Sequence, residues 1–263
     1  MWRIKIKVQI ILYGIGRASP QLVQRSLNNL KTYWPAGTVF HTTHIILKVN
    51  VVDNPRSGEQ YEQRELEPFA PNVDELIVTK IDDLEAQSSV ERSILKNYND
   101  IYKDNGKSLN NLFNQLLLLE YSEMKLIKVN LYDTVVCCRD DILVRKSPMI
   151  GFAHPKGNNI IIPGFHWHRG YNDRFMIGTA EVSRLWARRI QDLDKFHLSQ
   201  KNLSGEKLVK FTLDKNNINV SALPRVFPRV RHNDIICRER NPLSINRPRE
   251  FINIISAILK FLI

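Results

Sequence analysis

The sequence has few cysteines and no long apolar run, and each shortage excludes a class of protein. Its only cysteines are Cys137, Cys138 and Cys237, and none has the spacing of a metal site. Three cysteines do not make the disulfide framework of a small secreted domain, so we expect a reducing, cytoplasmic location. No stretch of about 18 apolar residues is present, so no helix is expected to span a bilayer. The N-terminus also lacks the apolar segment of a signal peptide.

Negative charge is also scarce: 38 lysines and arginines stand against 27 aspartates and glutamates, a formal net charge of +11. Such an excess favours polyanionic partners, namely nucleic acid, an anionic membrane surface or phosphate-bearing small molecules. Residues 225–249 alone contain seven arginines. No nucleic-acid-binding module accompanies them, so nucleic acid is not the partner we expect, although a basic nucleic-acid-binding protein stays an alternative.

Strand and helix patterns alternate along the chain. Residues 4–13 alternate between apolar and polar side chains and then become continuously apolar, which is typical of a strand that enters a core. A glycine-containing turn follows at residues 14–17, and Ser19-Pro20 has the pattern of a helix start. Strands and helices continue to interleave without an internal repeat. We therefore predict a single α/β domain over residues 1–248, with a mixed, mostly parallel sheet flanked by helices.

Three later segments have apolar residues at helical spacing and are predicted as helices: a long one around 109–117, then 179–193 and 206–215. Residues 249–263 are strongly apolar and are predicted as a separate C-terminal helix. That helix either packs against the core or a partner, or lies on a membrane surface beside the neighbouring arginines.

Two acidic residues, Asp140 and Asp141, directly follow the apolar strand predicted at 135–138. Open α/β sheets bind their ligands at the carboxyl ends of strands. Two carboxylates in that place could hold Mg²⁺ or Mn²⁺, which would bridge to a substrate diphosphate and offset the charge on the leaving phosphate. Adjacent aspartates are also common in solvated turns, so the pair alone leaves both interpretations open.

Two other segments contain candidate binding residues. The glycine turn at 14–17 would let backbone amides approach a phosphate, but it matches neither of the familiar glycine-rich nucleotide motifs, and an ordinary strand–helix turn is the alternative. Segment 164–175 mixes aromatic and polar side chains, which suits a sugar-binding surface. Its His166 and His168 lack a third zinc ligand at familiar spacing. Its Asp173 could equally form a structural ion pair with the adjacent arginine.

Taken together, these segments resemble a family of GT-A-like glycosyltransferases of the WavE-like kind, found in bacterial surface-polysaccharide clusters and in large DNA viruses. The resemblance covers residues 4–232. Its most specific motif is N-D-R-F-x-[IM]-G, present here as residues 172–178. A second motif, R-x-R-P-D, is altered, because Cys137 replaces its first arginine and Asp140 replaces its proline.

The resemblance implies an enzyme that transfers a sugar from a UDP- or GDP-sugar to a glycan or lipid-linked acceptor, assisted by Mn²⁺ or Mg²⁺. A lipid-linked acceptor would bring peripheral contact with a membrane. The altered motif leaves open a binding or scaffold protein that has kept the fold and lost the chemistry.

The resemblance also implies roles for individual residues. Donor binding is assigned to Gly14, Arg17, Asn111, Gln115 and Arg139. Metal binding is assigned to Asp141, with Asp140 as a second ligand. Asp173 is the candidate general base, or the contact to acceptor or sugar, and Glu206 is the alternative base.

Overall fold

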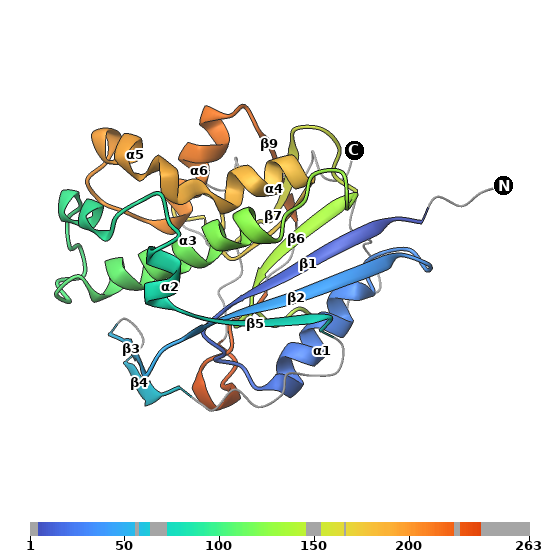
Figure 1. The fold of residues 1–263 in the computed structure, drawn as a ribbon, viewed down its shortest axis with the longest axis horizontal. Coiled ribbons are helices and arrows are strands. Elements are labelled where there is room, and N and C mark those ends of the chain that lie inside the picture. Colours follow the sequence, from blue (N-terminus) through green and yellow to red (C-terminus); the bar gives the residue numbers. More distant parts are fainter. Residues whose placement is uncertain are drawn as a thin grey trace.

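The structure is a computed structural model that describes residues 5–55, 58–63, 73–145, 154–165, 167–223 and 227–237. In these residues a seven-stranded sheet is flanked by helices on both faces (Figure 1). The predicted α/β class, with a mostly parallel central sheet, is therefore confirmed. The apolar segment 249–263 lies outside the described residues.

One strand of the sheet runs against the others. The strand order is β5-β2-β1-β6-β8-β7-β9. The strands are β1 (Lys7–Gly14), β2 (Val39–Lys48), β5 (Glu75–Lys80), β6 (Thr134–Arg139), β7 (Asn159–Pro163), β8 (Phe175–Gly178) and β9 (Asn219–Leu223). β8 pairs antiparallel with both β6 and β7, whereas the other pairs are parallel. The amino end of β8 consequently lies at the same edge as the carboxyl ends of the other strands.

The helices form two layers around the sheet (Figure 1). Helix α1 (Pro20–Lys31) packs on one face, and α3 (Lys107–Lys125), α4 (Ala180–Ala187) and α6 (Gly205–Lys215) pack on the other. The predicted helices around 109–117 and over 206–215 are thereby confirmed. Ser19 caps α1 as its sequence pattern indicates, because its hydroxyl accepts a hydrogen bond from the N–H of Leu22 (3.3 Å).

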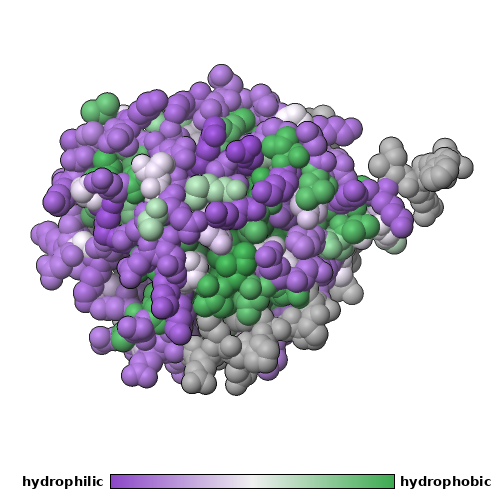
Figure 2. Space-filling view, in the orientation of Figure 1, coloured by the Kyte–Doolittle hydropathy of each residue, from purple (hydrophilic) through white to green (hydrophobic). Residues whose placement is uncertain are grey.

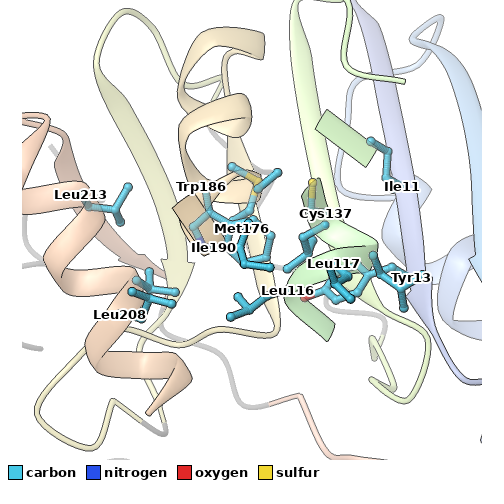
Figure 3. Close-up of a cluster of buried hydrophobic side chains, with 14 of the residues drawn as sticks. Ile11, Tyr13, Leu116, Leu117, Cys137, Met176, Trp186, Ile190, Leu208 and Leu213 are labelled. Atoms are coloured by element: carbon cyan, nitrogen blue, oxygen red, sulfur yellow. The ribbon is translucent and has the colours of Figure 1, made fainter. Parts of the chain in front are cut away.

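Alternate side chains of β1 face the two layers. Ile10 and Leu12 pack on the α1 side, whereas Ile11 and Tyr13 pack on the α3 side. Figure 3 shows this second cluster, in which side chains from β1 and β6 meet side chains from α3 and α4. Because both faces are covered, β1 is buried from Val8 to Tyr13 and β6 from Thr134 to Cys138, mostly through apolar side chains.

The predicted helix over 179–193 is wrong in its continuity, because α4 ends at Ala187. A 3₁₀ turn, η2 (Arg189–Asp192), and a short helix, α5 (Leu193–Ser199), follow it. The fully buried Arg189 side chain lies over the Trp186 ring, with its Cζ 4.1 Å from the ring centroid. Its Nη1 donates to the Trp186 carbonyl at 2.7 Å. The Trp186 carbonyl therefore accepts a hydrogen bond from this side chain close to the point where α4 ends.

Several short elements complete the described part of the chain: the hairpin β3 (Val51–Asn54) and β4 (Glu59–Glu62), α2 (Ile81–Glu85), η1 (Arg92–Asn97) and η3 (His232–Asp234). Most of the face seen in Figure 2 is hydrophilic, and hydrophobic residues gather where Figure 1 places the edge strand β5. Leu76 and Val78 of β5 are 40% and 44% exposed. Exposed Glu75 and Lys80 bound this short strand, an arrangement that discourages edge-to-edge pairing.

Candidate functional site

The strand order places a ligand site at the carboxyl ends of β1 and β6. From β1 the chain moves outward through β2 to β5, and it then crosses back to add β6 on the other side of β1. Open α/β sheets bind ligands where the strand order reverses in this way. A pocket of about 600 Å³ opens there. Its walls include residues that follow β1 and β6 and residues that precede β8.

The pocket brings together all of the residues that the sequence and the resemblance assigned to the site. Those residues are Gly14, Arg17, Asn111, Gln115, Arg139, Asp140, Asp141, Asp173 and Glu206. Asp173 reaches this edge because β8, which it precedes, is the reversed strand. Asn111 and Gln115 lie on the early turns of α3, and Glu206 lies on the first turn of α6. Their individual roles stay predictions.

Asp141 is held by two guanidinium groups. Arg139 donates to it from Nε (2.9 Å to Oδ1) and from Nη2 (2.5 Å to Oδ2), and Nη1 of Arg17 lies 3.7 Å from Oδ2. The Asp141 side chain is only 1% exposed. Burial acts to raise the pKa of this carboxyl, but the charges of Arg139 and Arg17 outweigh burial and hold the pKa below its usual value. Asp141 is therefore ionised at neutral pH.

The lowered pKa of Asp141 predicts a specific pH dependence of stability. Relative to an unfolded-state pKa of about 4, the ionised carboxylate contributes stability that is fully present at higher pH. That stability is lost as the pH falls through about 4 towards the lower pKa of the folded state. Asp141→Asn should lower the free energy of unfolding at pH 7 by about 2 kcal/mol. Urea unfolding of the variant and the parent should show this difference shrinking on acidification.

The control for this prediction is Asp214→Asn, which removes a carboxylate from the exposed Lys210–Asp214 pair. Exposed pairs contribute little to stability, so this variant should follow the parent at every pH. A difference for Asp141→Asn that stays constant on acidification would contradict the assignment.

The Asp140 carboxylate holds the glycine turn at residues 14–17 in place. Its Oδ2 accepts a hydrogen bond from the N–H of Gly16 (2.8 Å) and lies 3.4 Å from Nε2 of His44. The carboxylate also rests on Gly14, where an added Cβ would lie 2.0 Å from Oδ1. The amide of Ser19, at the start of α1, donates to Asp234 (2.8 Å). Since two of the amides around this turn already have carboxylate partners, a phosphate in the pocket would depend chiefly on side chains.

Five arginines line the pocket and form its cationic wall, and three of them had been assigned no role. Arg174, Arg229 and Arg231 line the pocket together with Arg17 and Arg139. Burial lowers the pKa of Arg174, and the nearby charges of Arg139 and Arg229 lower it further against the opposing effect of Asp173. Like charges gathered in this way are suited to an anionic ligand. Arg174 belongs to the N-D-R-F-x-[IM]-G motif, and Arg229 and Arg231 belong to the arginine-rich segment 225–249, which are the signals that could have identified them.

Arg17 and Arg231 of this wall are also linked to the hairpin. Glu59 of β4 accepts a hydrogen bond from Nη1 of Arg231 (2.7 Å) and lies 4.0 Å from Nη1 of Arg17. Asn111 donates to the carbonyl of Asp53 in β3 (3.1 Å). The hairpin thus closes one side of the pocket. Of the seven arginines in 225–249, only Arg229 and Arg231 fall within the described residues.

Asp173 and Glu206 both line the pocket next to the first turn of α6. The Asp173 carboxylate rests on Gly205, where an added Cβ would lie 2.3 Å from Oδ2, and Nε of Arg174 lies 3.8 Å from Oδ1. Glu206 accepts a hydrogen bond from the hydroxyl of Ser204 (2.8 Å). Two carboxylates at different depths of one pocket provide two candidate bases.

The two aspartates assigned to a metal ion do not fit that role in this arrangement. Mg²⁺ and the similar Mn²⁺ need ligand oxygens at about 2.0–2.2 Å in octahedral geometry. Both oxygens of Asp141 already accept from the Arg139 guanidinium, and a cation beside them would be repelled by the charges of Arg139 and Arg17. Across the described residues, no three His, Cys, Asp or Glu side chains are grouped as metal ligands. The metal ion itself stays a prediction, and no step is derived through it.

Two other sequence interpretations concern the histidines at 166 and 168 and the cysteine at 137. His168 lines the pocket, but His166 lies outside the described residues. Cys137, which replaces the first arginine of the R-x-R-P-D motif, is fully buried in the core cluster on the α3 side. Burial raises the pKa of its thiol to about 12, against a lowering effect of Arg189, so the thiol stays protonated. Position 137 therefore serves the core rather than the pocket.

Comparison with known proteins adds no family to this description. The chain matches no protein-family model, and a search of the curated proteins finds no similar sequence. Over the described ranges, none of the helices combines the length and the apolar character needed to cross a membrane.

Proposed function

We propose that the protein is a glycosyltransferase that moves a sugar from a UDP- or GDP-sugar to a hydroxyl group of a glycan or glycoconjugate acceptor. The observation that carries the proposal is the combination of five arginines and the Asp173 carboxylate in one pocket at the reversal point of the sheet. A volume of about 600 Å³ suits a ligand of this size. The GT-A-like assignment is supported by the mostly parallel sheet and by the resemblance.

Each part of the pocket has a function in such a reaction. Asp173 accepts the proton of the acceptor hydroxyl while that oxygen forms a bond to the anomeric carbon of the donor sugar. The bond from the anomeric carbon to the diphosphate breaks, and its electron pair leaves with the nucleoside diphosphate. The guanidinium groups of Arg17, Arg139 and Arg174 stabilise the negative charge that develops on this leaving group.

A donor screen tests the proposal. The full chain is incubated with UDP- and GDP-sugars, with and without Mn²⁺, and binding is measured by isothermal titration calorimetry. Release of UDP or GDP is followed on the same samples. Binding with slow release, in which water replaces the acceptor, is the expected result. No binding of any donor under either condition would overturn the proposal, whereas binding without release would indicate a protein that has kept the site and lost the chemistry.

A further inference from the structure

Arg139 lines the pocket with only one edge of its guanidinium paired to a carboxylate. A guanidinium carries five N–H donors in one plane. Asp141 occupies the edge formed by Nε and Nη2, which leaves the edge formed by Nη1 and Nη2 for another acceptor. Nη1 lies 3.5 Å from Oε1 of Gln115, at the outer limit of a hydrogen bond. A guanidinium held by a carboxylate on one edge and open on another is suited to bind a phosphate with two hydrogen bonds.

Two other buried donors belong to residues that contact Arg139 or its partner Asp141. Nε of Arg17 and Nε2 of Gln115 have no hydrogen-bond partner within the described part of the chain, and both residues line the pocket. The Arg17 side chain is 10% exposed, so its Nε is shielded from bulk water. A buried N–H without an acceptor is unfavourable, and an oxygen of a bound ligand would satisfy it. Both donors belong to the same group, since Arg17 contacts Asp141 and Gln115 contacts Arg139.

We infer that Arg139 and Arg17, held by Asp141, bind the diphosphate of the nucleotide-sugar in place of a divalent cation, so that donor binding is independent of metal ions. This inference rests on the proposed function, because it concerns the donor of that reaction. Asp141 is then a positioning residue, whose carboxylate orients both guanidinium groups. Asp140 is a positioning residue for the glycine turn, through its hydrogen bond from the N–H of Gly16.

The first test compares metal dependence across three probes. Binding of UDP-glucose, GDP-mannose and inorganic pyrophosphate to the full chain is measured by calorimetry in EDTA and again with Mn²⁺ or Mg²⁺. We expect pyrophosphate and at least one nucleotide-sugar to bind with the same affinity in both conditions.

The other outcomes separate this inference from the proposed function. Nucleotide-sugar binding that appears only with Mn²⁺ or Mg²⁺ overturns the inference and supports the proposed function. Binding of pyrophosphate in EDTA without binding of any nucleotide-sugar supports the guanidinium site and overturns the proposed function. No binding of any probe overturns both.

The second test changes the pair of hydrogen bonds that Arg139 donates to Asp141. Arg139→Lys keeps the positive charge and removes the second hydrogen bond, so pyrophosphate affinity should fall about tenfold. The matched control is Arg184→Lys, which alters the pair between Arg184 and Glu123 outside the pocket (Nε to Oε1, 2.6 Å) and should leave the affinity unchanged. Circular dichroism confirms that each variant is folded. An Arg139→Lys protein that binds as tightly as the parent overturns the inference.

The positioning role of Asp141 is tested by whether Asp141→Asn weakens or tightens pyrophosphate binding. Asp141→Asn removes a negative charge beside an anion site, and electrostatics alone would tighten pyrophosphate binding. If Asp141 orients Arg139 and Arg17, affinity should instead fall, because the guanidinium groups are no longer held. Unchanged or tighter binding by a folded Asp141→Asn protein overturns the positioning role.

Discussion

An Asp173→Asn variant is expected to release nucleoside diphosphate from a bound UDP- or GDP-sugar about 1,000-fold more slowly than the parent protein. Asparagine keeps the size of the side chain and its contact with Gly205, but it cannot accept a proton from the attacking oxygen. The Asp173 carboxylate faces the pocket that also holds the cationic wall. The rate is measured as UDP or GDP release at saturating donor, so that a change in donor affinity does not enter.

The matched variant is Glu206→Gln, which also replaces a carboxylate of this pocket by an amide of similar shape. It should keep most of the parent rate, because the carboxylate of Glu206 is engaged by the Ser204 hydroxyl in the first turn of α6. If Glu206→Gln is slow while Asp173→Asn is normal, the general base is Glu206. Normal rates in both variants would exclude a carboxylate base among these two residues.

The second large effect concerns stability, and it is expected for Gly170→Ala. A Cβ at Gly170 would lie 2.0 Å from the carbonyl oxygen of Glu206, which is backbone and cannot rotate away. The same oxygen accepts a hydrogen bond from the N–H of Tyr171 (2.9 Å), so this contact joins the loop before β8 to the first turn of α6. The substitution should lower the free energy of unfolding by about 3 kcal/mol, as measured by urea unfolding.

Gly37→Ala is the control for this prediction. Gly37 has a positive φ of 90°, but an added Cβ would meet nothing within 4 Å. Its cost should therefore be that of the backbone conformation alone, about 1 kcal/mol. Equal losses in the two variants would show that the close approach at Gly170 relaxes without consequence.

Elements with strong local signals could be predicted from the sequence. The apolar run of β1, the Ser19 cap of α1 and the apolar spacing of α6 all depend on neighbours in the chain, and each element forms as predicted. The break after Ala187 could not be predicted, because nothing in the local sequence indicates that the Arg189 side chain is fully buried over the Trp186 ring. The reversed direction of β8 was equally hidden, since only its pairing with β6 and β7 sets it.

The location of the site could be anticipated better than its internal contacts. The rule that ligands bind at strand ends pointed to Arg139, Asp140 and Asp141, and the structure places them in the pocket. Their partners depend on folding: Asp140 bonds to Gly16, which is 124 residues away in the chain. Because two neighbouring aspartates read alike in a sequence, only the geometry reveals that one holds a backbone turn and the other holds arginines.

The reversal of β8 also links ligand binding to the persistence of the fold. The pocket needs the ends of β1 and β6, the start of β8 and the first turns of α3 and α6, so it exists only when these five elements have assembled. A ligand that binds the folded state alone stabilises that state in proportion to the logarithm of its concentration relative to its Kd. A bound ligand would therefore oppose the separation of these elements, and the lifetime of the protein against proteolysis would follow the supply of that ligand.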